Sequence, residues 1–145
     1  MHYPKHLIAA IIAMSVFLSP GAYADQSKGL NVMVTSPERQ SQMMAMVLSV
    51  MTMKKHQKEV NMVLCGSAGD LALTSTKTAA LKPSGKSPTQ LLHALLKMGA
   101  RVEICPLYLP NAGKTKADLI KGISVAKPPV VAGRLLDNNY KILTY

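Results

Sequence analysis

Aromatic residues are scarce in this sequence of 145 residues, which holds no tryptophan, one phenylalanine and five tyrosines. Proteins that bind single-stranded nucleic acid stack the bases on aromatic side chains along a basic groove. The 17 lysine and arginine residues outnumber the seven aspartate and glutamate residues, but the lysines are scattered and have no aromatic platforms among them. We therefore expect no nucleic-acid partner. The charge predicts a solvated basic surface, or weak attraction for an acidic partner, an anionic lipid surface or an anionic sulfur species.

Several cofactor and catalytic motifs are also missing. The turn Gly66–Asp70 lacks both the Gly-Lys-Ser/Thr ending and the G-x-G-x-x-G spacing of nucleotide-binding loops. No G-x-S-x-G elbow for a serine hydrolase occurs. The two cysteines form no Cys-x-x-Cys pair, and the two histidines beyond residue 24, His56 and His93, are far apart in the sequence. We therefore expect neither a metal site nor a cofactor.

The N-terminal residues have the pattern of a secretory signal peptide. Lys5 is followed by an apolar run from Leu7 to Leu18, a break at residues 19–21 and the small-residue cleavage signal Ala22-Tyr23-Ala24. The apolar run is shorter than the roughly 20 residues of a transmembrane helix. The pattern predicts cleavage after Ala24, a periplasmic or secreted protein, and no membrane span in the mature chain.

The remaining residues are enough for one domain with one core. We expect a flexible leader over residues 25–29 and a single domain over residues 30–145. Short apolar runs predict strands, and three segments with helix-start signals lie between them. The expected strands are residues 30–35, 59–65, 101–105 and 140–145, with an ambiguous segment at 124–136 that Pro128-Pro129 interrupts. This order predicts an α/β fold, a three-layer α/β/α sandwich around a mainly parallel sheet of about five strands.

Capping signals place the helices. Ser36 with Pro37 predicts the start of a helix that runs to about Lys55, and its apolar stripe would comprise Met43, Met44, Val47, Leu48, Val50 and Met51. Ser87 with Gln90 forms a capping box for a second helix, residues 88–98, which Gly99 ends. Thr115 predicts a third, short helix over residues 115–122. Residues 106–113 are expected to form a loop.

Both cysteines end predicted strands. Cys65 ends the second strand and Cys105 ends the third, at the sheet edge where functional groups of parallel α/β proteins collect. Gly66 and Ser67 follow Cys65 directly, and the helix expected after Thr115, with Lys114 and Lys116, would favour an anion on sulfur. Three interpretations stay open from the residues alone: small buried side chains, a Cys65–Cys105 disulfide, or a reactive Cys105 thiol.

The succession of residues 31–35, the βαβ unit, the capped helix before Gly99, and Val102-Glu103-Ile104-Cys105 resembles the DsrE/DsrF-like family, which includes sulfur-relay subunits of the TusD type. The resemblance spans residues 30–145. It implies a parallel α/β sandwich, assembly as a homo-oligomer (trimer or hexamer), and a persulfide on Cys105, which stands at the position of the family's sulfur-carrying cysteine. Pro106, directly after Cys105, is a departure from the pattern expected of an anion site. Proline has no backbone N–H, so it offers no donor to an anion on the Cys105 sulfur.

The first hypothesis is therefore an exported DsrE-like protein, sulfurtransferase-like, that passes sulfur between a donor and an acceptor by persulfide transfer on Cys105, with Cys65 as a possible resolving partner. The partners would be proteins or small sulfur species. The alternative is a non-catalytic binding or assembly subunit with structural cysteines. A third idea is copper(I) handling by the methionines, for which core packing is the competing explanation. The methionines concerned are Met43, Met44, Met46, Met51, Met53 and Met62.

Overall fold

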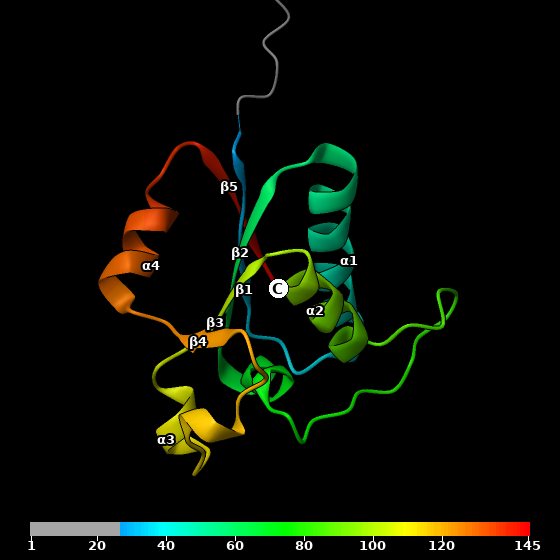
Figure 1. Cartoon of the computed structure of the whole chain (residues 1–145), viewed down its shortest axis with the longest axis vertical. Coiled ribbons are helices and arrows are strands. Elements are labelled where there is room, and N and C mark those ends of the chain that lie inside the picture. The colour runs from blue at the N-terminus through cyan, green and yellow to red at the C-terminus, as the bar shows by residue number, and fades with distance from the viewer. Residues whose placement is uncertain (1–26) are drawn as a thin grey trace, which may run out of the picture.

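A five-stranded parallel sheet forms the centre of the domain (Figure 1). The computed structural model describes residues 27–145, and the predicted signal peptide, residues 1–24, lies outside the described residues. The strands are β1 (Gly29–Val34), β2 (Glu59–Leu64), β3 (Arg101–Ile104), β4 (Ile123–Val125) and β5 (Tyr140–Thr144), in the order β4-β3-β2-β1-β5. All four neighbouring pairs are parallel. The predicted α/β sandwich is confirmed.

Helices cover both faces of this sheet. Figure 1 shows α1 (Arg39–His56) and α2 (Pro88–Lys97) on one side and α4 (Pro128–Leu135) on the other. Three shorter elements complete the described part: η1 (Gly66–Ala72), α3 (Tyr108–Asn111) and η2 (Lys116–Asp118), of which η1 and η2 are 3₁₀ helices. Both η1 and α3 come soon after a strand ends, so they lie at the carboxyl edge of the sheet. No helix of residues 27–145 is long and apolar enough to cross a bilayer.

The two faces of the sheet differ in chemistry. Because side chains alternate along a strand, even-numbered positions of β1, β2 and β3 point to one face and odd-numbered positions to the other. The even positions, together with Met46 of α1 and Leu92 and Leu95 of α2, form the fully buried apolar core; they are Val32, Val34, Met62, Leu64, Val102 and Ile104. On the α4 side, Asn31 donates to the carbonyl of Arg134, and Arg134 forms an ion pair with Glu103. The core therefore lies mainly between the sheet and the pair α1 and α2.

The first half of the domain follows the sequence expectations with three corrections. Gly29 belongs to β1, where it pairs with Glu59, rather than to the predicted flexible leader. Helix α1 begins at Arg39 with Glu38 as its N-cap residue, so Ser36 is not the cap and Pro37 precedes the helix. The predicted apolar stripe is wrong in part, because Met44, Leu48 and Met51 are exposed. This helix is apolar on most sides, and periodicity alone therefore could not select its buried face.

The second half mixes confirmed and wrong predictions. The capping box of α2 forms as expected between Ser87 and Gln90, and Gly99 follows the helix with a φ of 88°. The predicted helix over residues 115–122 is wrong, because η2 is only one 3₁₀ turn. Leu119 is extended there and pairs with Leu73. The ambiguous segment divides into β4 and α4, and Pro128 and Pro129 occupy the first turn of α4, where their missing N–H groups cost nothing.

Candidate functional site

Cys65 and Cys105 lie next to each other at the carboxyl edge of the sheet. β2 and β3 are parallel and in register up to the pair Leu64 and Ile104, so one further step brings the two cysteines opposite each other. The backbone N–H of Cys105 donates to the Leu64 carbonyl at 2.8 Å, and that of Cys65 donates to the Val34 carbonyl at 2.9 Å. The ladder of hydrogen bonds therefore continues through both cysteines and fixes their backbone positions.

Cys105 also affects the ionisation of Cys65. Both cysteines are free and half-buried. Burial raises the pKa of the Cys65 thiol above its ordinary value of 9.0, and the hydrogen bond to Cys105 and the charge of Cys105 raise that pKa further. The backbone N–H of Gly66, which hydrogen-bonds to Cys65, acts in the opposite direction. Cys65 therefore holds its proton in the resting pair, beside the Cys105 sulfur.

A cavity of about 550 Å³ opens onto this pair. Its wall on the β2 side consists of Cys65, Gly66 and Ser67, and its wall on the β3 side consists of Cys105, Leu107, Tyr108, Asn111 and Ala112. The β3 wall is thus largely apolar, whereas the β2 wall contributes the backbone and the Ser67 hydroxyl. Two accessible thiols on the wall of one cavity can exchange sulfur with a ligand or with each other.

Helix α3 supplies much of this cavity, although sequence reasoning expected a loop at residues 106–113. The Tyr108 N–H donates to the Cys105 carbonyl at 3.0 Å, which starts the turn directly after the cysteine. Leu109 is buried in the core and anchors the helix. Helix propensity alone did not predict α3, because the segment contains Pro106 and Pro110. The spacing of Tyr108, Leu109 and Ala112 from Cys105, at three, four and seven residues, was the signal that would have predicted a helix.

Tyr108 connects the two walls of the cavity. Its hydroxyl donates to Asp70 of η1, and its ring packs so tightly on Gly69 that a Cβ at Gly69 would lie 2.2 Å from the ring. Burial, followed by the hydrogen bond to Asp70 and the charge of that carboxylate, raises the pKa of Tyr108 to about 12. The phenol therefore stays protonated at neutral pH and holds η1 against α3.

The structure brings together four of the predicted site residues and separates three. One cavity is lined by Cys105, Cys65, Gly66 and Ser67. Lys114, Thr115 and Lys116 do not line it, because α3 lies between them and Cys105 in the chain. Thr115 caps η2, where its N–H and hydroxyl both donate to Asp118, and this lowers the pKa of Asp118. The element expected to stabilise an anion on sulfur is therefore a capped turn outside the cavity.

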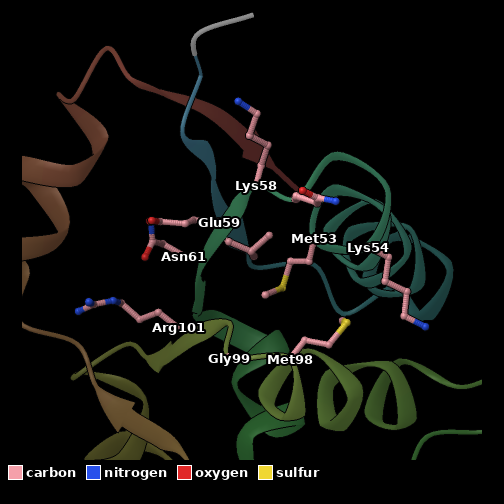
Figure 2. A pocket seen from close by; sticks show the side chains of 10 residues that line it. Met53, Lys54, Lys58, Glu59, Asn61, Met98, Gly99 and Arg101 are labelled. Atoms are coloured by element: carbon pink, nitrogen blue, oxygen red, sulfur yellow. The ribbon is translucent and has the colours of Figure 1, made fainter.

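A larger cavity, of about 710 Å³, lies at the opposite, amino edge of the sheet. Met53, Met98, Lys54, Glu59 and Arg101 are among its lining residues. Figure 2 shows Met53 and Met98 on the side of α1 and α2, whereas Glu59, Asn61 and Arg101 point to the other side of the strands. Its charged groups therefore diverge instead of meeting at one point, and its lining residues include no thiol.

The methionines of the copper hypothesis are dispersed in the described part of the chain. Met43, Met46 and Met62 are buried, Met44 and Met51 are exposed, and Met53 lines the amino-edge cavity. Core packing accounts for the three buried side chains. Among residues 27–145, no group of three or more histidine, cysteine, aspartate or glutamate side chains could hold a metal ion.

Solved structures of other proteins share this fold. YchN from E. coli superposes with a TM-score of 0.67 at 19% identity, over 82% of this chain and 99% of that one. A protein of unknown function from Methanobacterium thermoautotrophicum, MTH1491, gives 0.58 at 11% identity, over 82% and 99% of the two chains. Another from Bacteroides thetaiotaomicron, BT1422, gives 0.57 at 19% identity, over 81% and 95%. No protein-family model and no curated protein sequence matches the chain.

This likeness concerns the fold. The shared architecture is the parallel α/β sandwich that the sequence predicts. At 11–19% identity, the shared architecture does not extend to the chemistry of individual residues. Any inference about function therefore rests on the cysteine pair and its cavity.

Proposed function

We propose that this protein is a sulfur carrier of the DsrE-like kind that takes sulfane sulfur as a persulfide on Cys105. The observation that supports this most directly is a reduced cysteine at the end of a parallel strand, half-buried on the wall of an open cavity. A carrier thiol needs access for its donor together with partial shelter for the product. Both conditions are met at the carboxyl edge of the sheet.

The uptake step is a single displacement. The Cys105 thiolate attacks the outer sulfur of a hydropersulfide donor, a bond forms from Sγ to that sulfur, and the donor leaves as its thiolate. The apolar wall of Leu107, Tyr108 and Ala112 would limit the water around the persulfide. The expected export of the chain implies that donor and acceptor are extracytoplasmic proteins or small sulfur species.

Intact-mass measurement after incubation with glutathione persulfide tests the proposal. The reduced protein should gain one sulfur atom before any subsequent release, and Cys105→Ser should gain none. A wild-type protein that takes up no sulfur while both thiols remain modifiable by iodoacetamide would contradict it. That result would favour the alternative, a binding or assembly subunit whose cysteines are structural.

We also propose that the carrier is a homo-oligomer, a trimer or hexamer. Exposed apolar side chains on α1 support this: Met44, Leu48 and Met51 are 49%, 38% and 40% exposed. Their spacing places them on one side of the helix. Light scattering of the purified mature chain gives the test, and a monomer mass at micromolar concentration would refute self-association without affecting the proposal for Cys105.

A further inference from the structure

We propose that Cys65 is the resolving thiol of this site: it attacks the Cys105 persulfide, forms a Cys65–Cys105 disulfide and releases the carried sulfur as sulfide. This inference rests on the proposed function, because it needs a persulfide on Cys105. It adds an activity to that function. The protein would reduce sulfane sulfur as well as carry it.

Register supplies the first argument. The pairing of Leu64 with Ile104, continued by one residue, places Cys65 opposite Cys105 on neighbouring parallel strands. Cys65 still has extended backbone angles, with φ −142° and ψ 167°, and both cysteines keep their ladder hydrogen bonds. Neighbouring strands lie about 4.8 Å apart, within the roughly 4.4–6.8 Å between Cα atoms that a disulfide spans. The backbone therefore needs no rearrangement to allow the bond.

The surroundings of the pair supply the second argument. Both cysteines line the same cavity, and the nearness of Cys105 adds to the effect of burial on the pKa of the Cys65 thiol. A persulfide on Cys105 would therefore form beside a second thiol within reach. No other cysteine exists in the chain, so no competing intramolecular thiol could resolve it.

The proposed reaction has two steps, sulfide release and reduction of the disulfide, and atoms and electrons balance in each. The Cys65 sulfur forms a bond to Cys105 Sγ as the bond from Sγ to the outer sulfur breaks. The outer sulfur leaves with the electron pair as hydrosulfide, and the proton lost by Cys65 completes hydrogen sulfide. Two thiols are thus oxidised to a disulfide while one sulfane sulfur is reduced to sulfide. A dithiol reductant then restores both thiols by ordinary exchange and becomes oxidised itself.

A single-turnover experiment tests this inference. Reduced protein, freed of reductant under anaerobic conditions, receives less than one equivalent of glutathione persulfide. Free sulfide is then measured, and the protein is alkylated and weighed intact. The wild type should release one sulfide for each persulfide consumed, and the molecules that reacted should end two hydrogen masses lighter, with both cysteines protected from alkylation.

Cys65→Ser and Cys65→Ala serve as paired variants, because both lack the thiol and only the first keeps a hydroxyl. Each should retain the added sulfur on Cys105. Sulfide release should slow by about a hundredfold or more, since the attacking thiol must then come from another molecule at low concentration. If either variant fails to fold, a non-reducing digest of the wild type after turnover must still contain the peptide joined through residues 65 and 105.

The outcomes separate the two proposals. If the wild type keeps the added sulfur and Cys65 remains open to alkylation, the resolving role is wrong and the carrier proposal stands. If neither the wild type nor the Cys65 variants take up or release sulfur, the carrier proposal itself fails. Release at the wild-type rate from Cys65→Ala would also overturn the resolving role.

Discussion

The two edges of the sheet differ in the volume of their cavities and in the side chains that line them. The amino edge holds the larger cavity, about 710 Å³, with diverging charged groups and two thioethers (Figure 2). The carboxyl edge holds the smaller one, about 550 Å³, which both cysteines line. Cavity volume alone would select the amino edge. The direction of the parallel strands favours the carboxyl edge, because functional groups of parallel α/β proteins collect where the strands end and the loops begin.

The largest expected effect is on sulfur uptake, and one experiment compares the two edges of the sheet. Cys105→Ser should abolish sulfur uptake from glutathione persulfide, because a neutral hydroxyl is a far weaker nucleophile than a thiolate. Arg101→Met, which changes the other end of the same strand and a wall of the larger cavity, should leave uptake unchanged. Intact mass after a fixed incubation measures both, with uptake counted either as one added sulfur atom or as the loss of two hydrogens that follows sulfide release. Equal loss in the two variants would mean that the edges are not functionally distinct.

The second prediction concerns the ionisation of Cys65. Because its pKa is raised above 9.0, its alkylation rate should still be increasing as the pH passes 9. Replacing Cys105 by serine removes the neighbouring charge, so the Cys65 profile should move to lower pH while burial continues to raise the pKa. Peptide mapping after pulses of iodoacetamide from pH 7 to pH 10.5 follows this residue, and identical profiles in the two proteins would show that the thiols are not coupled.

The third prediction tests how the carboxyl-edge cavity is built. Gly69→Ala should lower the free energy of unfolding by about 1–3 kcal/mol, since the new methyl group would overlap the Tyr108 ring. Gly133→Ala is the matched control: it lies in α4 with no other atoms near its Cβ position, and it should raise stability by about 0.5–1 kcal/mol. Urea denaturation measures both. Equal effects would mean that the ring moves aside freely.

The smallest expected effect is a loss of stability at alkaline pH. The folded-state pKa of Tyr108 is about 12 against an ordinary 10.0, so between these values the unfolded chain loses this proton and the folded chain keeps it. The unfolding free energy should therefore fall as the pH rises from 10 towards 12. Tyr108→Phe should be less stable at pH 8 but show a shallower fall. An equally steep fall would assign the alkaline loss to other groups.

The sequence was sufficient for the architecture, and it predicted that Cys65 and Cys105 would lie at the same edge of the sheet. Alternating apolar runs and the Ser87 capping box predicted the strands and α2, because those signals are local. The buried face of α1 could not be predicted, since Met44 and Met46 are equally apolar and only the packed sheet distinguishes them. The supporting role given to Lys114 and Lys116 depended on a helix that contacts between Leu119 and Leu73 prevent. Tertiary pairing decided that segment against its local propensity.

The position of the two cysteines on neighbouring strands has a consequence for heat resistance. A covalent link between them would close a loop of about 40 residues and, by the chain-entropy model, would stabilise the fold by about 4 kcal/mol relative to the reduced chain. Oxidation would then be visible as a higher melting temperature, without any probe for sulfur. A thermal shift assay in graded redox buffers would report the potential at which the pair changes state.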